Sequence, residues 1–263
     1  MNPLFQVIYE DADLLVVHKP ADLVCHPTKG DEYSSLISRA RIYFSGAGHE
    51  VLGAGECSEP GASRPEPRLV HRLDRETSGL VLIAKNAVAA RELGKIWETR
   101  AVRKEYLTIV HGHVAAEHGI IDAPLGRDEA SIVAIKDCVR PDGTPAQTEF
   151  FVEKRFSRPD AAAFSLLRLH PQTGRKHQIR IHLAHIGHPI IGDKIYGGDP
   201  DLYLALVERR LTEEQRRRLL LPQHALHAGR LQFEWRGQNY DFTTPPEPFF
   251  LQFVAGGKAA PAV

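Results

Sequence analysis

Residues 69–84 run Leu-Val-His-Arg-Leu-Asp-Arg-Glu-Thr-Ser-Gly-Leu-Val-Leu-Ile-Ala, a charged segment followed directly by an apolar one. The apolar end, residues 80–84, predicts a buried strand. Asp74 therefore lies near the edge of that strand, with Arg72 and Arg75 on either side. Such a carboxylate can do chemistry, but the same residues also suit an ordinary salt-bridged turn, since paired surface charges are usually structural. The residue types alone leave both interpretations open.

The composition is that of an ordinary globular protein, with 43% hydrophobic and 25% charged residues in a chain of 263. The formal net charge is zero, so any affinity for nucleic acid must come from local patches. Cys25, Cys57 and Cys138 are odd in number and far apart, which argues against a disulfide framework and favours a reducing, cytoplasmic setting. The first residues lack the pattern of a secretory signal. No apolar run approaches the roughly 20 residues of a membrane span.

Many short strands with few helices between them predict an α+β fold, with a mixed and largely antiparallel central sheet flanked by helices and loops. Apolar runs and period-2 alternation predict strands at 5–9, 14–18, 80–84, 105–110, 148–152, 164–170, 226–235 and 239–243, with shorter pieces such as 132–135. Helical spacing and capping residues predict helices at 34–44, 86–100 and 202–221, and a short one that ends at Gly187. We expect one catalytic domain over residues 1–255, with a flexible Gly/Pro-rich loop at 45–68 and a disordered tail at 256–263.

A second dense segment follows the predicted strand at 164–170. Between residues 168 and 194, five basic residues face one acidic residue, Asp193, which gives a local charge of +4 in a neutral chain. Such a patch suits phosphate backbones, although a solvated helix face has the same appearance. Thr173 and Gly174 precede the short helix, whose N-terminus could hold a phosphate.

The sequence also contains a histidine pattern that bears on metal binding. His182, His185 and His188 have a spacing that invites a zinc interpretation. However, Gly187 ends the helix before the third histidine, and no cysteine or acidic ligand is close in sequence. The chain has no glycine-rich dinucleotide motif and no phosphate-binding loop of the GxxxxGK type. We therefore expect neither a metal nor an organic cofactor.

Taken together, the motifs resemble those of the RluA-type pseudouridine synthases. The matching segments occur in order at 19–20, 71–74, 77–79, 104–106, 145–149, 173–182, 188–193 and 226–228. The resemblance spans about residues 6–250, and it implies the pseudouridine synthase fold and an isomerase that acts on uridine in RNA. In that reaction the bond from C1′ to N1 breaks, the base rotates, and it rejoins the sugar through C5.

The resemblance also implies roles for individual residues. Asp74 corresponds to the catalytic aspartate, acting at C1′ or on the 2′ side of the sugar, Tyr106 to the tyrosine that stacks on the base, and Arg180 to the arginine that pairs with the aspartate. Arg72 corresponds to a residue that holds the target nucleotide out of its stack, which the reaction requires because the base must turn. The residues we expect to contact the substrate are His71, Arg72, Thr77, Arg175, Lys176, His177 and Gln178.

The expected partner is ribosomal or transfer RNA, with no membrane and no obligatory protein partner. Many relatives carry an N-terminal S4-type RNA-binding module. This chain begins directly with the predicted strands at 5–9 and 14–18 of the catalytic domain, so we expect its RNA contacts to come from that domain. The sequence leaves open which uridine is modified and in which RNA.

Two other functions are compatible with part of these motifs. A nucleoside or glycoside hydrolase also uses a carboxylate at an anomeric carbon, but it needs a second carboxylate, and Glu76 is the one near candidate in sequence. A non-catalytic RNA-binding protein would have no need to keep Asp74, Tyr106 and Arg180 together. The isomerase is therefore the hypothesis that the sequence favours.

Overall fold

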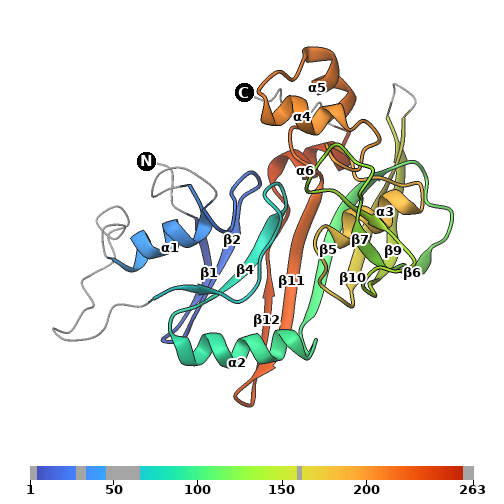
Figure 1. Ribbon diagram of the computed structural model, residues 1–263. Coiled ribbons are helices and arrows are strands. Elements are labelled where there is room, and N and C mark those ends of the chain that lie inside the picture. Colours follow the sequence, from blue (N-terminus) through green and yellow to red (C-terminus); the bar gives the residue numbers. More distant parts are fainter. Residues whose placement is uncertain (1–4, 28–33, 46–65, 159–161, 257–263) are drawn as a thin grey trace. The chain divides into compact units, whose positions relative to one another are not determined.

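The structure is a computed structural model that describes residues 5–27, 34–45, 66–158 and 162–256. These residues form two compact units, one from residues 1–103 and 230–245 and the other from 104–229 and 246–263. Most of the predicted 45–68 loop and of the 256–263 tail lies outside the described residues. Figure 1 labels the helices and strands of both units.

The first unit is built on three neighbouring antiparallel strands, in which β2 lies between β1 and β4. Its elements are β1 (Gln6–Glu10), β2 (Leu14–Lys19), α1 (Leu36–Phe44), β3 (Arg68–Leu69), β4 (Ser78–Ala84), α2 (Ala87–Glu98) and β12 (Gln238–Thr243), together with the end of β11 (Leu226–Trp235). All seven residues of β4 are buried, as expected for the apolar run at 80–84. Helix α2 packs on β3 and β4 (Figure 1), with Ala89 and Leu93 in the core.

The second unit contains four antiparallel strands in the order β5-β10-β9-β6. Its elements are β5 (Arg103–His111), β6 (His118–Asp122), β7 (Leu125–Arg127), β8 (Asp137–Val139), β9 (Gln147–Ser157), β10 (Ala163–Pro171), α3 (Gln178–His185), α4 (Asp201–Val207), α5 (Glu213–Leu219) and α6 (Pro248–Val254). Strands β7 and β8 form a separate two-stranded sheet.

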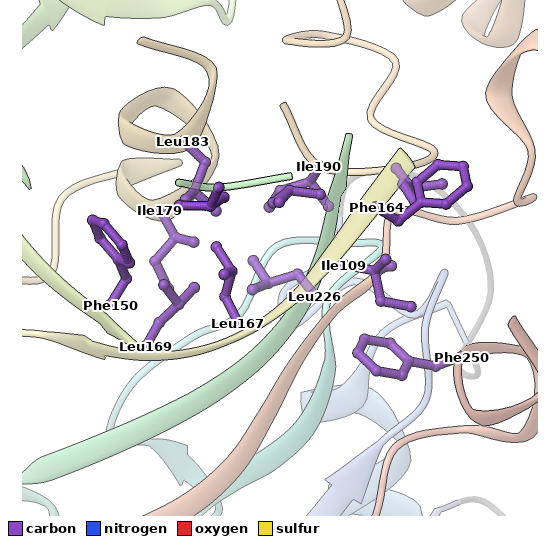
Figure 2. Packing of buried hydrophobic residues seen from close by; sticks show 14 of the residues in the cluster. Ile109, Phe150, Phe164, Leu167, Leu169, Ile179, Leu183, Ile190, Leu226 and Phe250 are labelled. Carbon is purple, nitrogen blue, oxygen red and sulfur yellow. The ribbon is translucent and has the colours of Figure 1, made fainter. Parts of the chain in front are cut away.

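The core of the second unit lies between α3 and its sheet. Figure 2 shows Ile179 and Leu183 pointing from α3 toward Phe150, Leu167 and Leu169 on β9 and β10, and all five side chains are buried. On its other side, Ile181 is buried in a second apolar cluster with Leu125 and Val133, so all residues from Gln178 to Leu183 of this short helix are buried.

The predicted α+β class is confirmed, and so are most of the predicted elements. Capping side chains mark the starts of two of the confirmed helices. The side chain of Asn86 accepts hydrogen bonds from the backbone of Val88 and Ala89, and Thr212 and Gln215 form the expected capping box. No helix among the described residues is long and apolar enough to cross a membrane.

Two predicted elements were wrong. The helix at 202–221 is two helices, because α4 closes with backbone bonds from Arg209 and Arg210 to Leu206 and Ala205, and Arg209 has a left-handed backbone, φ 57°. Residues 132–135 form a turn and not a strand. Of this apolar run, only Val133 is clearly buried, while Ile132 and Ile135 are exposed, so the run lacks the alternation of a strand.

Candidate functional site

Asp74 lies in the turn that connects β3 to β4. The backbone N–H of Val70 donates to Leu82 O at 3.1 Å, and the N–H of Thr77 donates to Asp74 O at 3.2 Å, which closes the turn. Gly79 follows with φ 118°, a backbone conformation that favours glycine. Asp74 is half-buried, whereas Thr77 is fully buried. The expected RNA contact of Thr77 remains a prediction.

A buried lysine supports this turn. Lys19, at the end of β2, has a relative accessibility of 0%. Its Nζ donates to the carbonyl oxygens of Pro20 at 2.8 Å, Leu23 at 2.8 Å and Arg75 at 3.0 Å. A buried charge is tolerated only with such partners. The lysine therefore ties the backbone next to Asp74 to β2, a role that the sequence did not suggest.

The neighbours of Asp74 have separate surroundings. His71 stacks on Trp97 with ring centroids 4.4 Å apart, and its Nε2 accepts the N–H of Leu82 at 3.1 Å. Arg75 pairs with Asp22 at 2.6 Å, and both side chains are largely exposed. Arg75 thus belongs to a surface ion pair, and His71 contributes to packing. The expected substrate contacts of His71 and of the exposed Arg72 remain predictions.

Tyr106 lies on β5 opposite Leu169 of β10 and is half-buried against the core of the second unit. Because side chains alternate along a strand, Lys104 and Thr108 share its face. Lys104 Nζ donates to Thr173 O at 3.4 Å, and Thr108 Oγ1 donates to Ala225 O at 2.7 Å. This face of β5 therefore reaches the turn that precedes α3.

That turn is built around Gln178, the first residue of α3, which is buried. Its Oε1 accepts the hydroxyl of Thr173 at 2.5 Å and the N–H of Arg175 at 3.1 Å. Its Nε2 donates to Gln147 O and Thr148 Oγ1, both at 2.9 Å. The amide of Gln178 thus assembles the turn. Its expected contact with RNA remains a prediction.

The remaining residues of the turn differ in exposure. Arg175 and Lys176 are exposed. Lys176 Nζ lies 2.8 Å from Asp137 Oδ2, and Arg175 Nε donates to Pro145 O at 3.3 Å. His177 has φ 54°, and its Nδ1 shares a 3.0 Å hydrogen bond with the Tyr196 hydroxyl. Two cations therefore stand at the surface of the second unit, beside a histidine that is fixed in place.

Arg180 is buried on α3 and makes a two-bond ion pair with Asp193. Its Nε donates to Asp193 Oδ2 at 2.7 Å and its Nη2 to Oδ1 at 2.9 Å, while the guanidinium carbon lies 5.1 Å from the ring centroid of Tyr196. Burial alone would raise the pKa of Asp193, but the charge and hydrogen bonds of Arg180 hold that pKa well below its usual range. Burial raises the pKa of Tyr196, so its hydroxyl stays neutral.

Sequence reasoning missed this partner. Asp193 was counted as the one acidic residue in a basic segment and as part of the 188–193 motif, and no contact was assigned to it. The expected pairing of Arg180 with Asp74 joins residues of different units and remains a prediction, as does the role of Tyr106. The signal that was available is that Asp193 is the one acidic residue in the segment 168–194, which also contains Arg180.

The three histidines of the spacing considered for zinc are not equivalent. His182 is buried, and its ring nitrogens lie 2.9 Å from Thr148 Oγ1 and 3.0 Å from Ala123 O. Burial lowers the pKa of His182. His188 Nδ1 lies 2.9 Å from His111 O. Across the ranges that the structure describes, no group of three or more His, Cys, Asp or Glu side chains is placed to hold a metal ion.

Comparison with known proteins gives concordant matches. Residues 13–185 match the family model described as RNA pseudouridylate synthase. An uncharacterized RNA pseudouridine synthase of Aquifex aeolicus (strain VF5) is 38% identical over 196 residues, which are 74% of this chain and 57% of the relative. The ribosomal large subunit pseudouridine synthase D of Haemophilus ducreyi (strain 35000HP) is 33% identical over 89% of this chain and 64% of the relative. The enzyme of the same name from Pasteurella multocida (strain Pm70) is 34% identical over 98% of this chain and 72% of the relative.

A solved structure extends the likeness to the fold. Human RNA pseudouridylate synthase domain containing 1 superposes with a TM-score of 0.71 at 25% identity, over 97% of this chain and 89% of that one. The chain spans 57% and 64% of the length of the first two bacterial relatives. The matched region includes Asp74, Tyr106 and Arg180.

Proposed function

This chain belongs to the RNA pseudouridylate synthase family, and from that premise we propose that it isomerises uridine to pseudouridine in RNA. The observation that carries the proposal is the family match over residues 13–185, which spans all three residues assigned to catalysis. Relatives named ribosomal large subunit pseudouridine synthase D favour ribosomal RNA as the substrate.

In the proposed mechanism Asp74 is the catalytic carboxylate. It acts on the sugar of a nucleotide that is turned out of its stack, because C1′ and C5 cannot both be reached while the base stays paired. The bond from C1′ to N1 breaks, the uracil rotates, the bond from C1′ to C5 forms, and the C5 proton leaves while N1 gains one. In this mechanism Tyr106 stacks on the base and takes that proton. The product is an isomer of the substrate, so the reaction consumes no co-reactant.

Arg180 supplies the cation that keeps Asp74 ionised, since a nearby positive charge lowers the pKa of a carboxylate. A guanidinium has five N–H groups, and Asp193 accepts from two of them. The same guanidinium is assigned to the pairing with Asp74. Arg72, which is exposed on the same turn as Asp74, is assigned to holding the nucleotide in its extruded position.

The proposal is tested by chemical mapping of pseudouridine in total RNA from cells with and without this protein. We expect one or a few modified positions to disappear on deletion and to return with the wild-type gene. A map that is the same with and without the gene would contradict the proposal. With purified protein and RNA, release of free uracil without pseudouridine would indicate a hydrolase, and binding without any product would indicate a non-catalytic RNA-binding protein.

We further predict that Arg175 contacts RNA phosphates. Each phosphate contact that is lost reduces the slope of log affinity against log salt concentration by about 1. Arg175→Ala should therefore flatten this slope, measured by filter binding or fluorescence anisotropy over a salt series. Lys176→Ala should have a smaller effect, because Asp137 already neutralises Lys176.

The matched control is Arg216→Ala on α5, which removes another exposed arginine of the same unit. Its slope should equal that of the wild type. Equal slopes for the wild type, Arg175→Ala and Arg216→Ala would place the phosphate contacts elsewhere.

A further inference from the structure

The contact between Arg180 and Asp193 differs from the other ion pairs described here in its burial. The Arg180 side chain is 6% exposed and that of Asp193 is 0% exposed, whereas the equally two-bonded pair of Arg210 and Asp201 is 46% exposed on both sides. A buried pair is weak support for stability, since apolar residues of similar volume often stabilise a fold as well or better. A property other than stability therefore has to account for the presence of this buried ion pair.

We infer that Asp193 is a positioning residue that holds the guanidinium of Arg180 in the orientation required for catalysis. This inference rests on the proposed function, in which Arg180 faces the catalytic carboxylate. Arginine has a long side chain with many rotamers, and a planar fork binds a carboxylate in one geometry. Two bonds to Asp193 fix both the place and the plane of the guanidinium, and the ring of Tyr196 lies 5.1 Å from its carbon atom.

Asp193 is itself firmly held. Its Oδ1 accepts the backbone N–H groups of Ile195 at 2.9 Å and Tyr196 at 3.0 Å. Just before it, the N–H of Ile191 donates to Ile109 O on β5 at 3.0 Å. The carboxylate that orients Arg180 is therefore anchored to β5, the strand that also carries Tyr106. Within the second unit, both residues assigned to catalysis share one rigid support.

The preceding residue reinforces this arrangement. Gly192 has φ 78°, and a Cβ there would lie 2.5 Å from Gln223 O. The backbone that leads into Asp193 is thus packed against the chain at Gln223 without room for a side chain. The carboxylate of Asp193 is therefore fixed in position and can orient the longer side chain of Arg180.

The two oxygens of Asp193 have different partners, which makes a selective test possible. Oδ1 accepts from Ile195 N–H, Tyr196 N–H and Arg180 Nη2, whereas Oδ2 accepts from Arg180 Nε. Asp193→Asn keeps the Oδ1 acceptor, and with it the bonds to the backbone of Ile195 and Tyr196. It places an N–H₂ group opposite Arg180 Nε, so two donors face each other. The substitution therefore disturbs Arg180 and spares the turn.

We expect Asp193→Asn to lower the single-turnover rate of pseudouridine formation at saturating enzyme by about 100-fold, the effect of misplacing a catalytic group by about an ångström. The dissociation constant for RNA should not change. Asp193→Glu keeps the charge but moves the carboxylate by one methylene, so it should also be slow.

The matched control is Asp201→Asn, which makes the same change in the exposed pair with Arg210; its rate should equal that of the wild type. A second measurement does not depend on activity. In ¹⁵N-labelled protein, the Arg180 Nε–H signal, assigned by its loss in Arg180→Lys, should exchange slowly with solvent in the wild type and in Asp201→Asn. It should exchange fast in Asp193→Asn.

The outcomes are distinguishable. A wild-type protein that forms no pseudouridine refutes the proposed function and the inference with it. An active wild type with a normal rate in Asp193→Asn, or a normal rate in Asp193→Glu, overturns the inference alone. If Asp193→Asn does not fold, as judged by its thermal transition, the rate and the Nε–H signal of Asp193→Glu decide in the same way.

Discussion

Asp74→Asn is expected to abolish pseudouridine formation while leaving RNA affinity at the wild-type level. The amide has the shape of the carboxylate but neither its charge nor its nucleophilicity, so a step that needs an ionised oxygen cannot proceed. Removal of a nucleophilic or acid–base residue lowers rates by factors on the order of 10⁴. The rate is measured as nucleoside composition by mass spectrometry, under single-turnover conditions with enzyme in excess.

The structure explains why the turn should survive this change. The bonds described for it are carried by the backbone, from Thr77 N–H to Asp74 O, and by Lys19, whose ammonium group holds the carbonyl of Arg75. Asp22→Asn is the matched control, because it alters a carboxylate that pairs with Arg75 at the surface. That control should retain full activity. A wild-type rate in Asp74→Asn would remove Asp74 from the mechanism.

The elements that the sequence predicted well are those with local causes. The strand at 226–235 has the predicted bounds, and Asn86 and Thr212 cap their helices, because alternation and capping depend on residues a few positions apart. The errors at 132–135 and 202–221 have local causes too. The apolar run at 132–135 predicts a strand although only Val133 is buried, and the helix end at Arg209 has no glycine to mark it in the sequence.

The parts of the site that escaped prediction depend on contacts distant in sequence. Lys19 holds a carbonyl 56 residues away, and the amide of Gln178 binds a strand 31 residues away at Gln147. Arg180 and Asp193 are only 13 residues apart, but a helix and a loop separate them. Charged residues are buried only when the tertiary fold brings a partner into contact with them. The sequence pattern alone therefore does not specify which residue that partner is.

Arg180→Ala is expected to lose both activity and stability, for reasons that can be separated. Without its guanidinium, the cation assigned to Asp74 is gone and the isomerisation should become undetectable. Asp193 is then left buried without its partner, which typically costs about 3–5 kcal/mol in the free energy of unfolding. Urea denaturation measures that cost, and the same nucleoside assay measures the rate.

The pH dependence follows from the lowered pKa of Asp193. A carboxyl group with a depressed pKa in the folded state stabilises the fold above its unfolded pKa of about 3.9, and this contribution is lost as the pH falls through the folded pKa. The wild type should therefore keep the contribution at pH 7 and lose it only in strong acid. In Arg180→Ala the pKa of Asp193 rises, because burial now acts without the compensating charge. The stability deficit of this variant should thus shrink as the pH is lowered and Asp193 becomes protonated.

A double variant separates the two losses. In Arg180→Met with Asp193→Asn both buried charges are removed, a change that is often neutral or stabilising, and the Asn oxygen still accepts the backbone N–H groups of Ile195 and Tyr196. Its free energy of unfolding should return toward that of the wild type, while the isomerisation stays absent because the cation is still missing. If activity returned together with stability, Arg180 would be a structural residue only, and another cation would have to stand opposite Asp74.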